Sequence, residues 1–406
     1  MMTSDAPDRS YSTRLRTALL LTGTGTAGAY HAGVLRALHE AGIKIDLVGG
    51  RGVGAASALF AAIDGGPRLW EASGIWKSPA ARGFYGWRTP LRYAGYAVSI
   101  AGIVFLIPIA LLALAVLVGL AGMLATLVGL ESVGSSLTTA YTGWIGVLFA
   151  PAALPTVVPR LVLLALLAAA VILGAGAITG FLRDRARRRS RTGSFWRLFS
   201  APLSAAVIIE RSTTEIWNLI RGAAPLAIPS RTELARRYVE LLADNLGQPG
   251  FRELLLTVHD VDARRDLVFS LLSPDHRGRF VSRTHAKPEP RHAEAFDLAG
   301  ASRDHVIDAL AAALSVPLAT DPHLITFAAD GPWRGETHRL CDRPDAIGRL
   351  VEEAAYAGAE QIILVAPSPQ AAKAHELSAS RADLRGRAGE LLAAFEAGSL
   401  RDVQEQ

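Results

Sequence analysis

A glycine triplet near the N-terminus has the spacing of a catalytic turn but lacks the catalytic side chain. The segment Leu47–Ser57 runs from apolar residues through glycines to small residues, which predicts a strand, a tight turn and a helix. Many hydrolases carry their nucleophile in such a turn as Gly-x-Ser-x-Gly, because the turn lifts the serine hydroxyl above the sheet. Here Gly50 and Gly54 are the outer glycines, and Gly52 takes the serine position. A glycine has no side chain that could form an acyl-enzyme.

A second glycine-rich turn, Gly23–Gly28, follows the apolar run that ends at Leu21. It matches Gly-x-Gly-x-x-Gly, a spacing found in dinucleotide sites. It also precedes a helical pattern, so its N–H groups could face an anion. A dinucleotide site needs an acidic residue at the far end of the second strand, whereas Asp46 stands at the near end. An oxyanion loop is therefore favoured, with dinucleotide binding as an alternative.

One aspartate follows a predicted strand and has the position of a catalytic base. The apolar run Ile325–Ala329 is followed directly by Asp330 and Gly331. Asp64 has similar neighbours, but it follows a predicted helix, where glycine is typical of a helix terminator. Asp330 is therefore the candidate base.

Other polar residues are weaker candidates for chemistry. Ser57 lies more than one helical turn beyond Gly52, so it is not expected to replace the missing nucleophile. His31 and His39 are interpreted as packing or surface residues, and Cys341, the single cysteine, as structural. No cluster of His, Cys, Asp or Glu has metal-ligand spacing, so we expect no metal and no cofactor.

The predicted elements alternate between strands and helices on both sides of a long apolar stretch. Residues 15–66 predict strand, loop, helix, strand, turn and helix, which is a βαβ unit. Further along, helices are expected over 213–246, 306–314 and 345–358, and strands over 251–258, 266–273, 325–329 and 361–366. This alternation favours one α/β sheet that is interrupted by an insertion.

The insertion contains two runs, 97–130 and 161–181, that exceed or match the roughly 20 apolar residues needed to cross a bilayer core. Between them, 131–141 is expected to be a polar loop and the proline-containing 144–158 an interfacial or re-entrant piece. A hairpin buried in a soluble core is the alternative.

Basic residues flank both outer ends of these runs. Arg88 and Arg92 precede the first, and an arginine block follows the second, at Arg183, Arg185, Arg187, Arg188, Arg189 and Arg191. This distribution predicts that both ends face the cytoplasm. A basic block beside a membrane segment favours lipid phosphate or topology control, so nucleic acid is not an expected partner.

The three motifs, in this order, resemble those of the patatin-like phospholipase family: Gly-Gly-Gly-x-Arg/Lys-Gly, then Gly-x-Ser-x-Gly, then Asp-Gly-Gly/Ala. They correspond to Gly23–Gly28, Gly50–Gly54 and Asp330–Pro332. The resemblance covers about residues 16–70 and 205–366. The expected fold class is therefore α/β: a patatin-like α/β/α layered domain with a mainly parallel sheet, interrupted by an inserted transmembrane helical hairpin.

The resemblance implies a Ser–Asp dyad with the glycine loop as its oxyanion hole. Carried over, the serine position is Gly52 and the aspartate is Asp330. Three more positions depart from the family pattern: Thr24 replaces the middle loop glycine, Ala27 replaces the basic residue, and Arg51 precedes the nucleophile position. The loop otherwise consists of Gly23, Gly25, Thr26 and Gly28. Four changes in two motifs predict a natural loss of hydrolysis, although Gly50 and Gly54 are expected to let the turn accept a serine.

The expected function is that of a membrane-anchored pseudohydrolase that binds lipid or acyl groups, or that scaffolds a membrane protein partner or homo-oligomer. An active lipid acyl hydrolase, a phospholipase or esterase with an unrecognised nucleophile or a water activated by Asp330, is an alternative. The protein is expected to be an integral membrane protein with its globular domain on the cytoplasmic side. The expected parts are a disordered tail (1–14), a domain in two pieces (15–94 and 183–370), the hairpin (95–182) and a polar helical tail (371–406).

Overall fold

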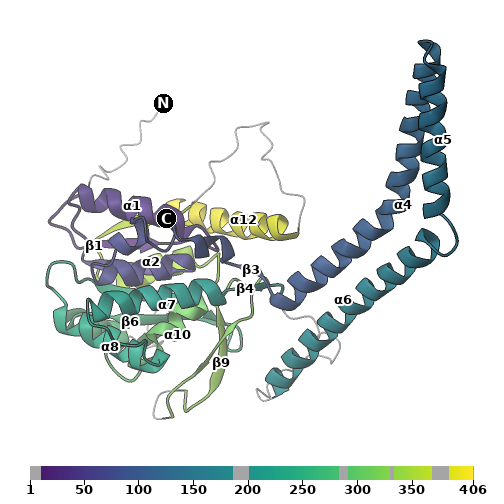
Figure 1. Ribbon diagram of the computed structural model, residues 1–406. Helices are drawn as coiled ribbons and strands as arrows, with labels where there is room; N and C mark the ends of the chain where they lie inside the picture. The colour runs from purple at the N-terminus through teal and green to yellow at the C-terminus, as the bar shows by residue number, and fades with distance from the viewer. Residues whose placement is uncertain (1–10, 186–200, 283–290, 330–332, 368–383, 406) are drawn as a thin grey trace. The chain divides into compact units, whose positions relative to one another are not determined.

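The computed structural model describes residues 11–185, 201–282, 291–329, 333–367 and 384–405 (Figure 1). The chain divides into two compact units, Trp87–Pro202 and the remainder on either side of it. The inserted unit is thus longer at both ends than the expected 95–182. It leaves the first unit after β3 (Gly86–Trp87), and the chain returns at β4 (Leu203–Ser204).

The larger unit is built on a sheet of eight strands in the described part of the chain. Its main path runs β10-β1-β2-β5-β6-β7, with bounds β10 (Gln361–Val365), β1 (Thr17–Leu21), β2 (Leu47–Arg51), β5 (Glu253–Asp260), β6 (Arg265–Leu271) and β7 (Ala293–Asp297). All neighbours on this path are parallel except β5 and β6. An antiparallel hairpin, β8 (His323–Thr326) and β9 (Thr337–Cys341), joins the sheet through β9 and β5. The mainly parallel α/β sheet expected from the sequence is confirmed.

Alternate residues of the strands feed two separate apolar clusters, one on each face of the sheet. Leu19 and Leu21 belong to the larger cluster and Leu20 to the smaller, because successive side chains of a strand point to opposite faces. The larger cluster packs on α1 (Gly28–Glu40), α2 (Val53–Ala62), α7 (Ala206–Arg221), α8 (Arg231–Asn245) and α10 (Val306–Ala313). The smaller packs on α9 (Pro274–Val281) and α11 (Ile347–Tyr356). These are the three layers of an α/β/α fold.

Helix α2 occupies the centre of the larger unit. Every one of its residues is buried, and a helix that is apolar on all sides needs such a position. The remaining short elements are α3 (Pro67–Trp70) and two 3-10 turns, Pro79–Gly83 and Arg303–His305.

Several predicted boundaries differ from the structure. The helix expected over 213–246 is two helices, α7 and α8, and the strand expected to end at Ala329 is β8, which ends at Thr326. Strands β7 and β9 were not predicted. Tyr11 and Ser12, expected in a disordered tail, are hydrogen-bonded to Lys44 and Gln361, whereas 1–10 lie outside the described residues.

The described part of the inserted unit contains three helices, α4 (Thr89–Leu127), α5 (Glu131–Leu148) and α6 (Leu154–Arg185). The predicted polar loop over 131–141 is wrong, because these residues form the first part of α5 and pack on α4. Gly122 and Gly134 allow this close packing: a Cβ at Gly122 would lie 3.2 Å from the Gly134 carbonyl oxygen. Residues 144–148 continue α5, and α6 already begins at Leu154, so the re-entrant piece is also replaced by helices.

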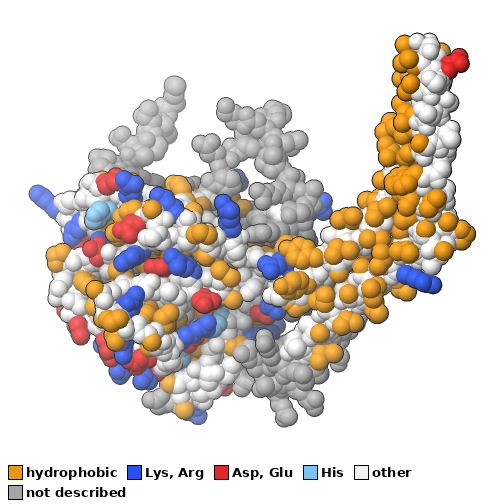
Figure 2. All heavy atoms as spheres, in the orientation of Figure 1, with side chains coloured by type: hydrophobic (Ala, Val, Ile, Leu, Met, Phe, Trp, Pro, Cys, Tyr) orange, Lys and Arg blue, Asp and Glu red, His pale blue; other side chains and the backbone are white. Residues whose placement is uncertain are grey.

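Large apolar side chains are exposed along the inserted unit, including Ile103, Val116 and Leu163. Figure 2 shows hydrophobic side chains gathered over α4 and α6. Within the described residues, two helices are long and apolar enough to cross a membrane, α4 and the Leu154–Thr179 part of α6. At 1.5 Å per residue, the 39 residues of α4 extend about 58 Å, far more than the roughly 30 Å of a bilayer core. The helix contains Pro108, and proline removes a helix hydrogen bond and favours a bend.

Candidate functional site: a closed elbow

The glycine triplet forms a sharp turn between β2 and α2. Gly52 is the residue before the first turn of α2, with φ 55° and ψ −135°, a conformation that side chains disfavour. Gly54 lies so close to β1 that a Cβ there would be 1.9 Å from the Leu21 carbonyl oxygen. The backbone of a nucleophile elbow is therefore present, although its hydroxyl is not.

The space that a serine side chain would need at position 52 is already occupied. A Cβ at Gly52 would lie 2.2 Å from the Gly23 carbonyl oxygen and 2.8 Å from Asp342 Oδ2. The first contact is with backbone, which cannot move aside as the end of a flexible side chain can. The expectation that the turn would accept a serine is therefore wrong.

The glycine loop turns a carbonyl, not an N–H group, toward the elbow. The Val53 N–H donates a hydrogen bond of 2.8 Å to the Gly23 carbonyl oxygen. In hydrolases with this turn, the N–H of the residue after the nucleophile is one donor of the oxyanion hole. In this protein that donor is satisfied within the chain. Of the other loop residues, Ala27 is the residue before the first turn of α1. Gly28 packs against Trp76, because a Cβ there would lie only 2.2 Å from the indole ring.

The side chain of Arg51 occupies the space beside the elbow. Its side chain is only 1% exposed, and Nη1 lies 3.1 Å from Asp342 Oδ1 and 3.2 Å from Oδ2. Burial raises the pKa of Asp342 to about 6; the positive charge of Arg51 opposes this rise, and the negative charge of Glu396 adds to it. Near neutral pH the pair is an ion pair inside the protein, where breaking it by removing one partner is costly.

Asp342 occupies the place where a dyad aspartate would be expected. It follows β9, whose last residues pair with the carboxyl end of β5, and β5 is the parallel neighbour of β2. The carboxyl ends of these strands therefore meet at the elbow. Asp330, the aspartate predicted from its Asp-Gly string, lies outside the described residues. The signal that was missed is the alternating pattern of Thr337–Cys341 with an aspartate directly after it.

Thr24 and a residue from the C-terminal helix complete the network. The Thr24 hydroxyl lies 3.0 Å from Asp342 Oδ2 and 2.6 Å from Glu396 Oε1. Glu396 belongs to α12 (Leu384–Glu405) and also forms an ion pair with Arg51. Thr24, which replaces the middle glycine of the family's loop, thus lies between two carboxylates. Nothing in the local sequence indicated that a residue 345 positions away would contact Arg51.

Ser57 and His31 form a second polar pair beside the elbow, but within the core. His31 Nε2 is 2.7 Å from the Thr22 carbonyl oxygen, so it carries the proton, and Nδ1 accepts from the Ser57 hydroxyl at 3.2 Å. Both residues are at most 1% exposed. The pKa of His31 is lowered to about 4, mainly by burial; the Thr22 hydrogen bond opposes this shift and the charge of Arg51 adds to it. His31 is therefore a neutral packing residue.

These two shifts predict opposite pH effects on stability. Between about pH 6.5 and 4, His31 is protonated in the unfolded chain but not in the folded protein. The free energy of unfolding therefore decreases as the pH falls across this window, by about 3 kcal/mol. Asp342 has the opposite sign, because below about pH 6 the folded protein binds a proton that the unfolded chain takes up only near 3.8.

The prediction is tested with His31→Gln and Asp342→Asn, by thermal unfolding between pH 7.5 and 4.5. Relative to wild type, the melting temperature of the His31 variant should rise as the pH falls, and that of the Asp342 variant should drop. Parallel curves for all three proteins would contradict both assignments.

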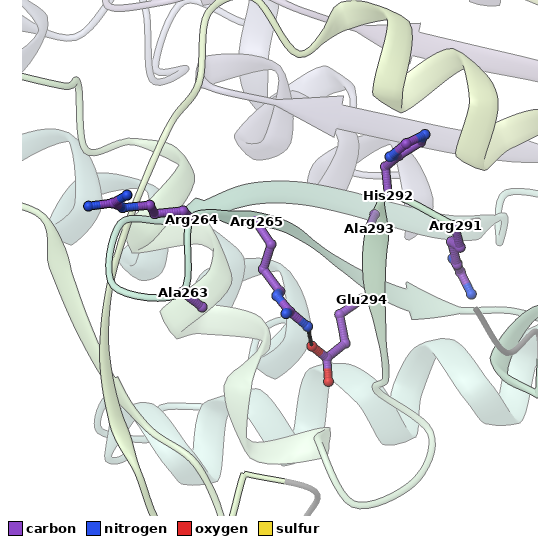
Figure 3. Close-up of a pocket in the computed structure, with 7 residues that line it drawn as sticks. All are labelled: Ala263, Arg264, Arg265, Arg291, His292, Ala293 and Glu294. Carbon is purple, nitrogen blue, oxygen red and sulfur yellow. Dashed lines mark hydrogen bonds and ion pairs between the residues drawn. The ribbon is translucent and has the colours of Figure 1, made fainter. Parts of the chain in front are cut away.

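Two hollows of the larger unit lie away from the elbow. One, of about 330 Å³, is lined by Ala263, Arg264, Arg265, Arg291, His292, Ala293 and Glu294 (Figure 3). Its charges are partly paired, because Arg265 bonds Glu294 and Arg291 bonds Glu353. Another, of about 300 Å³, lies between α1 and α3 and includes Leu38 and Trp70. No group of three His, Cys, Asp or Glu residues in the described ranges could hold a metal ion.

The structure combines a mainly parallel α/β sheet, a glycine loop after β1 and a sharp turn between β2 and α2, with Gly52 at the position where many hydrolases carry their nucleophile. The family model described as Patatin-like phospholipase matches residues 19–103, which include both glycine motifs. The resemblance to this family is thus confirmed over that segment. Comparison with curated proteins and with solved structures gave no match.

Proposed function

We propose that this protein is a membrane-anchored pseudohydrolase, in which a patatin-like unit has lost ester hydrolysis and serves as a scaffold for a membrane partner. The closure of the elbow carries the proposal. Gly52 offers no nucleophile, the Gly23 carbonyl takes up the Val53 N–H, and Arg51 holds the nearby Asp342. A substrate carbonyl would find neither an attacking group nor that oxyanion donor.

The filled site favours scaffolding over a permanently bound lipid. Arg51 and the Asp342 carboxylate are buried, and Glu396 covers them from α12. An acyl group could approach Gly52 only if these side chains moved. The lipid-binding form of the hypothesis therefore requires a change in α12.

An active hydrolase is the second candidate, because Ser57 contacts a histidine. In this reading Ser57 would be the nucleophile and His31 Nδ1 the base. His31 belongs to α1 and Ser57 to α2, both are buried, and neither lines the hollows described above. Catalysis would require the core to open.

Purified protein should not react with a fluorophosphonate probe and should not hydrolyse p-nitrophenyl butyrate or phosphatidylcholine. The probe labels only activated serines, so a serine hydrolase in the same detergent is the positive control. Stoichiometric labelling would refute the pseudohydrolase. Labelling that disappears in Ser57→Ala would establish the second candidate instead.

The membrane anchor is proposed from α4 and α6, which expose apolar side chains along lengths that exceed a bilayer core. Hydrocarbon side chains on this scale are unfavourable in water. Arg88 precedes α4 and Arg92 lies in its first turn, and the arginine block begins near the end of α6. Basic flanks at both ends support an orientation with the larger unit in the cytoplasm.

This orientation predicts distinct labelling of two single-cysteine sites in intact cells. A cysteine at Ser135, in α5, should react with a membrane-impermeant thiol reagent, whereas one at the exposed Lys77 of the larger unit should react only after permeabilisation. The native Cys341 is buried, and burial raises its pKa to about 12, so it should contribute no background. The reverse pattern would refute the orientation.

A further inference from the structure

Helix α12 contacts the closed elbow through one narrow face. The inward residues are Leu392, Glu396, Ser399 and Val403, spaced as one side of a helix. Leu392 packs on the larger apolar cluster, and Val403 lies 3.5 Å from the Cβ position of Gly348. The Ser399 hydroxyl donates to the Asp345 carbonyl at 2.8 Å. Ala393, Ala397 and Leu400 are also half-buried, so the docked face combines apolar packing with the polar contacts of Glu396 and Ser399.

The flank of α12 next to this face also bears apolar residues. Leu391 is 53% exposed and Phe395 52% exposed. A helix that is held mainly by hydrophobic burial would direct such side chains inward. The inward position next to Phe395 is instead taken by Glu396. This arrangement indicates that Glu396 selects the docked face.

Glu396 places a second carboxylate beside the guanidinium of Arg51, which already forms an ion pair with Asp342. Arg51 bonds Asp342 through Nη1 and Glu396 through Nη2, and its Nε finds no hydrogen-bond partner in the described part of the chain. Burial is the main cause of the raised pKa of Asp342, and the negative charge of Glu396 adds to the rise, because the two carboxylates repel each other. Arg51 and the Thr24 hydroxyl therefore bind the carboxylate of Glu396 in addition to that of Asp342, with both residues acting as hydrogen-bond donors.

We propose that Arg51 and Thr24 form a carboxylate-binding site that this chain fills with its own Glu396, and that an external carboxylate exchanges with Glu396 and releases α12. The inference rests on the proposed function, since it gives a closed, non-hydrolytic elbow a ligand. No bond is made or broken in the exchange. Arg51 and Thr24 donate the same hydrogen bonds to a different carboxylate, and the displaced Glu396 enters water.

The docking of α12 can be followed through the accessibility of Ser399. This residue is 8% exposed when α12 is docked, so Ser399→Cys should react slowly with a thiol reagent. Phe395→Cys, on the exposed flank of the same helix, is the matched control whose reactivity does not depend on docking. The full chain in detergent is used throughout, at constant ionic strength.

Sodium octanoate is the probe, and octanol is its neutral control. Acetate is tested in parallel, because it distinguishes a site for small free carboxylates from a site for the headgroup of an amphiphile. Octanoate should raise the labelling rate of Ser399→Cys about 10-fold or more, octanol should not, and Phe395→Cys should be unaffected. Adding Glu396→Gln should raise the basal rate to a similar extent. Thr24→Val should weaken the response to octanoate.

Equal effects of octanoate and octanol would overturn the proposal, as would an unchanged basal rate in Glu396→Gln. An acetate response equal to that of octanoate would assign the site to free carboxylates, and a response to octanoate alone would assign it to amphiphiles. Fluorophosphonate labelling, measured on the same samples, separates the two hypotheses. Unlabelled protein with no octanoate response removes this inference alone, whereas labelled protein removes the proposed function.

Discussion

Replacing Arg51 by methionine is expected to lower the free energy of unfolding by about 3–5 kcal/mol at pH 7.5. The change removes the cation between Asp342 and Glu396, and leaves a fully buried carboxylate beside a second one. The loss should shrink as the pH falls toward about 6, because without Arg51 the pKa of Asp342 lies above its wild-type value and the variant takes up a proton before wild type does. Urea unfolding followed by tryptophan fluorescence measures both effects.

Two variants make this result specific to the network. Arg401→Met changes the same residue type at an exposed position of α12 and should cost less than about 0.5 kcal/mol. Combining Arg51→Met with Asp342→Asn and Glu396→Gln removes all three charges together and should recover most of the stability. A loss at Arg51 that is independent of pH, or that the triple change does not relieve, would show that packing rather than charge is responsible.

Gly52→Ser is expected to destabilise the protein by about 2–4 kcal/mol and to give no esterase activity. The new Cβ would meet the Gly23 carbonyl at 2.2 Å, and a non-glycine residue would have to hold φ near 55°. Overpacking costs about 1–3 kcal/mol, and a strained backbone adds a similar amount. Any relief must come from moving the glycine loop, which carries the hydrogen bond from Val53.

Gly33→Ser is the matched control for this substitution. Gly33 lies in α1 with no heavy atom within 4 Å of its Cβ position, so the same chemical change should have little effect there. Unfolding curves and p-nitrophenyl butyrate assays on both variants decide the matter. An active Gly52→Ser protein of wild-type stability would mean that the elbow is open in solution and that only the hydroxyl is missing.

The part of the fold that could be predicted is the part whose signals are local. The glycine loop and the elbow each follow an apolar run and precede a helical pattern, so β1, α1, β2 and α2 could be placed from residues 15–66 alone. Helix α5 was missed because its first turns contain serine, threonine and glycine, residues typical of a loop; its packing on α4 at Gly134 outweighs their low helix propensity.

The centre of the site could be predicted only in outline. Gly52 and Arg51 are adjacent in the sequence, and their roles follow from the motif. Asp342 is brought to them by the pairing of β9 with β5, a register that involves two residue pairs. Glu396 arrives from another helix at the far end of the chain. Tertiary pairings of this kind leave no signal in the local sequence. An Asp-Gly string is visible there, and it led to the prediction of Asp330.

The strand order has a consequence for how the protein is made. Strand β1 lies between β2, which is synthesised shortly after it, and β10, which is synthesised last of the strands. Strand β2 in turn pairs with β5, which emerges only after the whole inserted unit. Since chains leave the ribosome from the N-terminus, α4 and α6 are available for insertion before the sheet can close. On this timetable the proposed membrane anchor would be inserted before the sheet folds, and the unpaired edges of β1 and β2 would have to be kept from other chains in the interval.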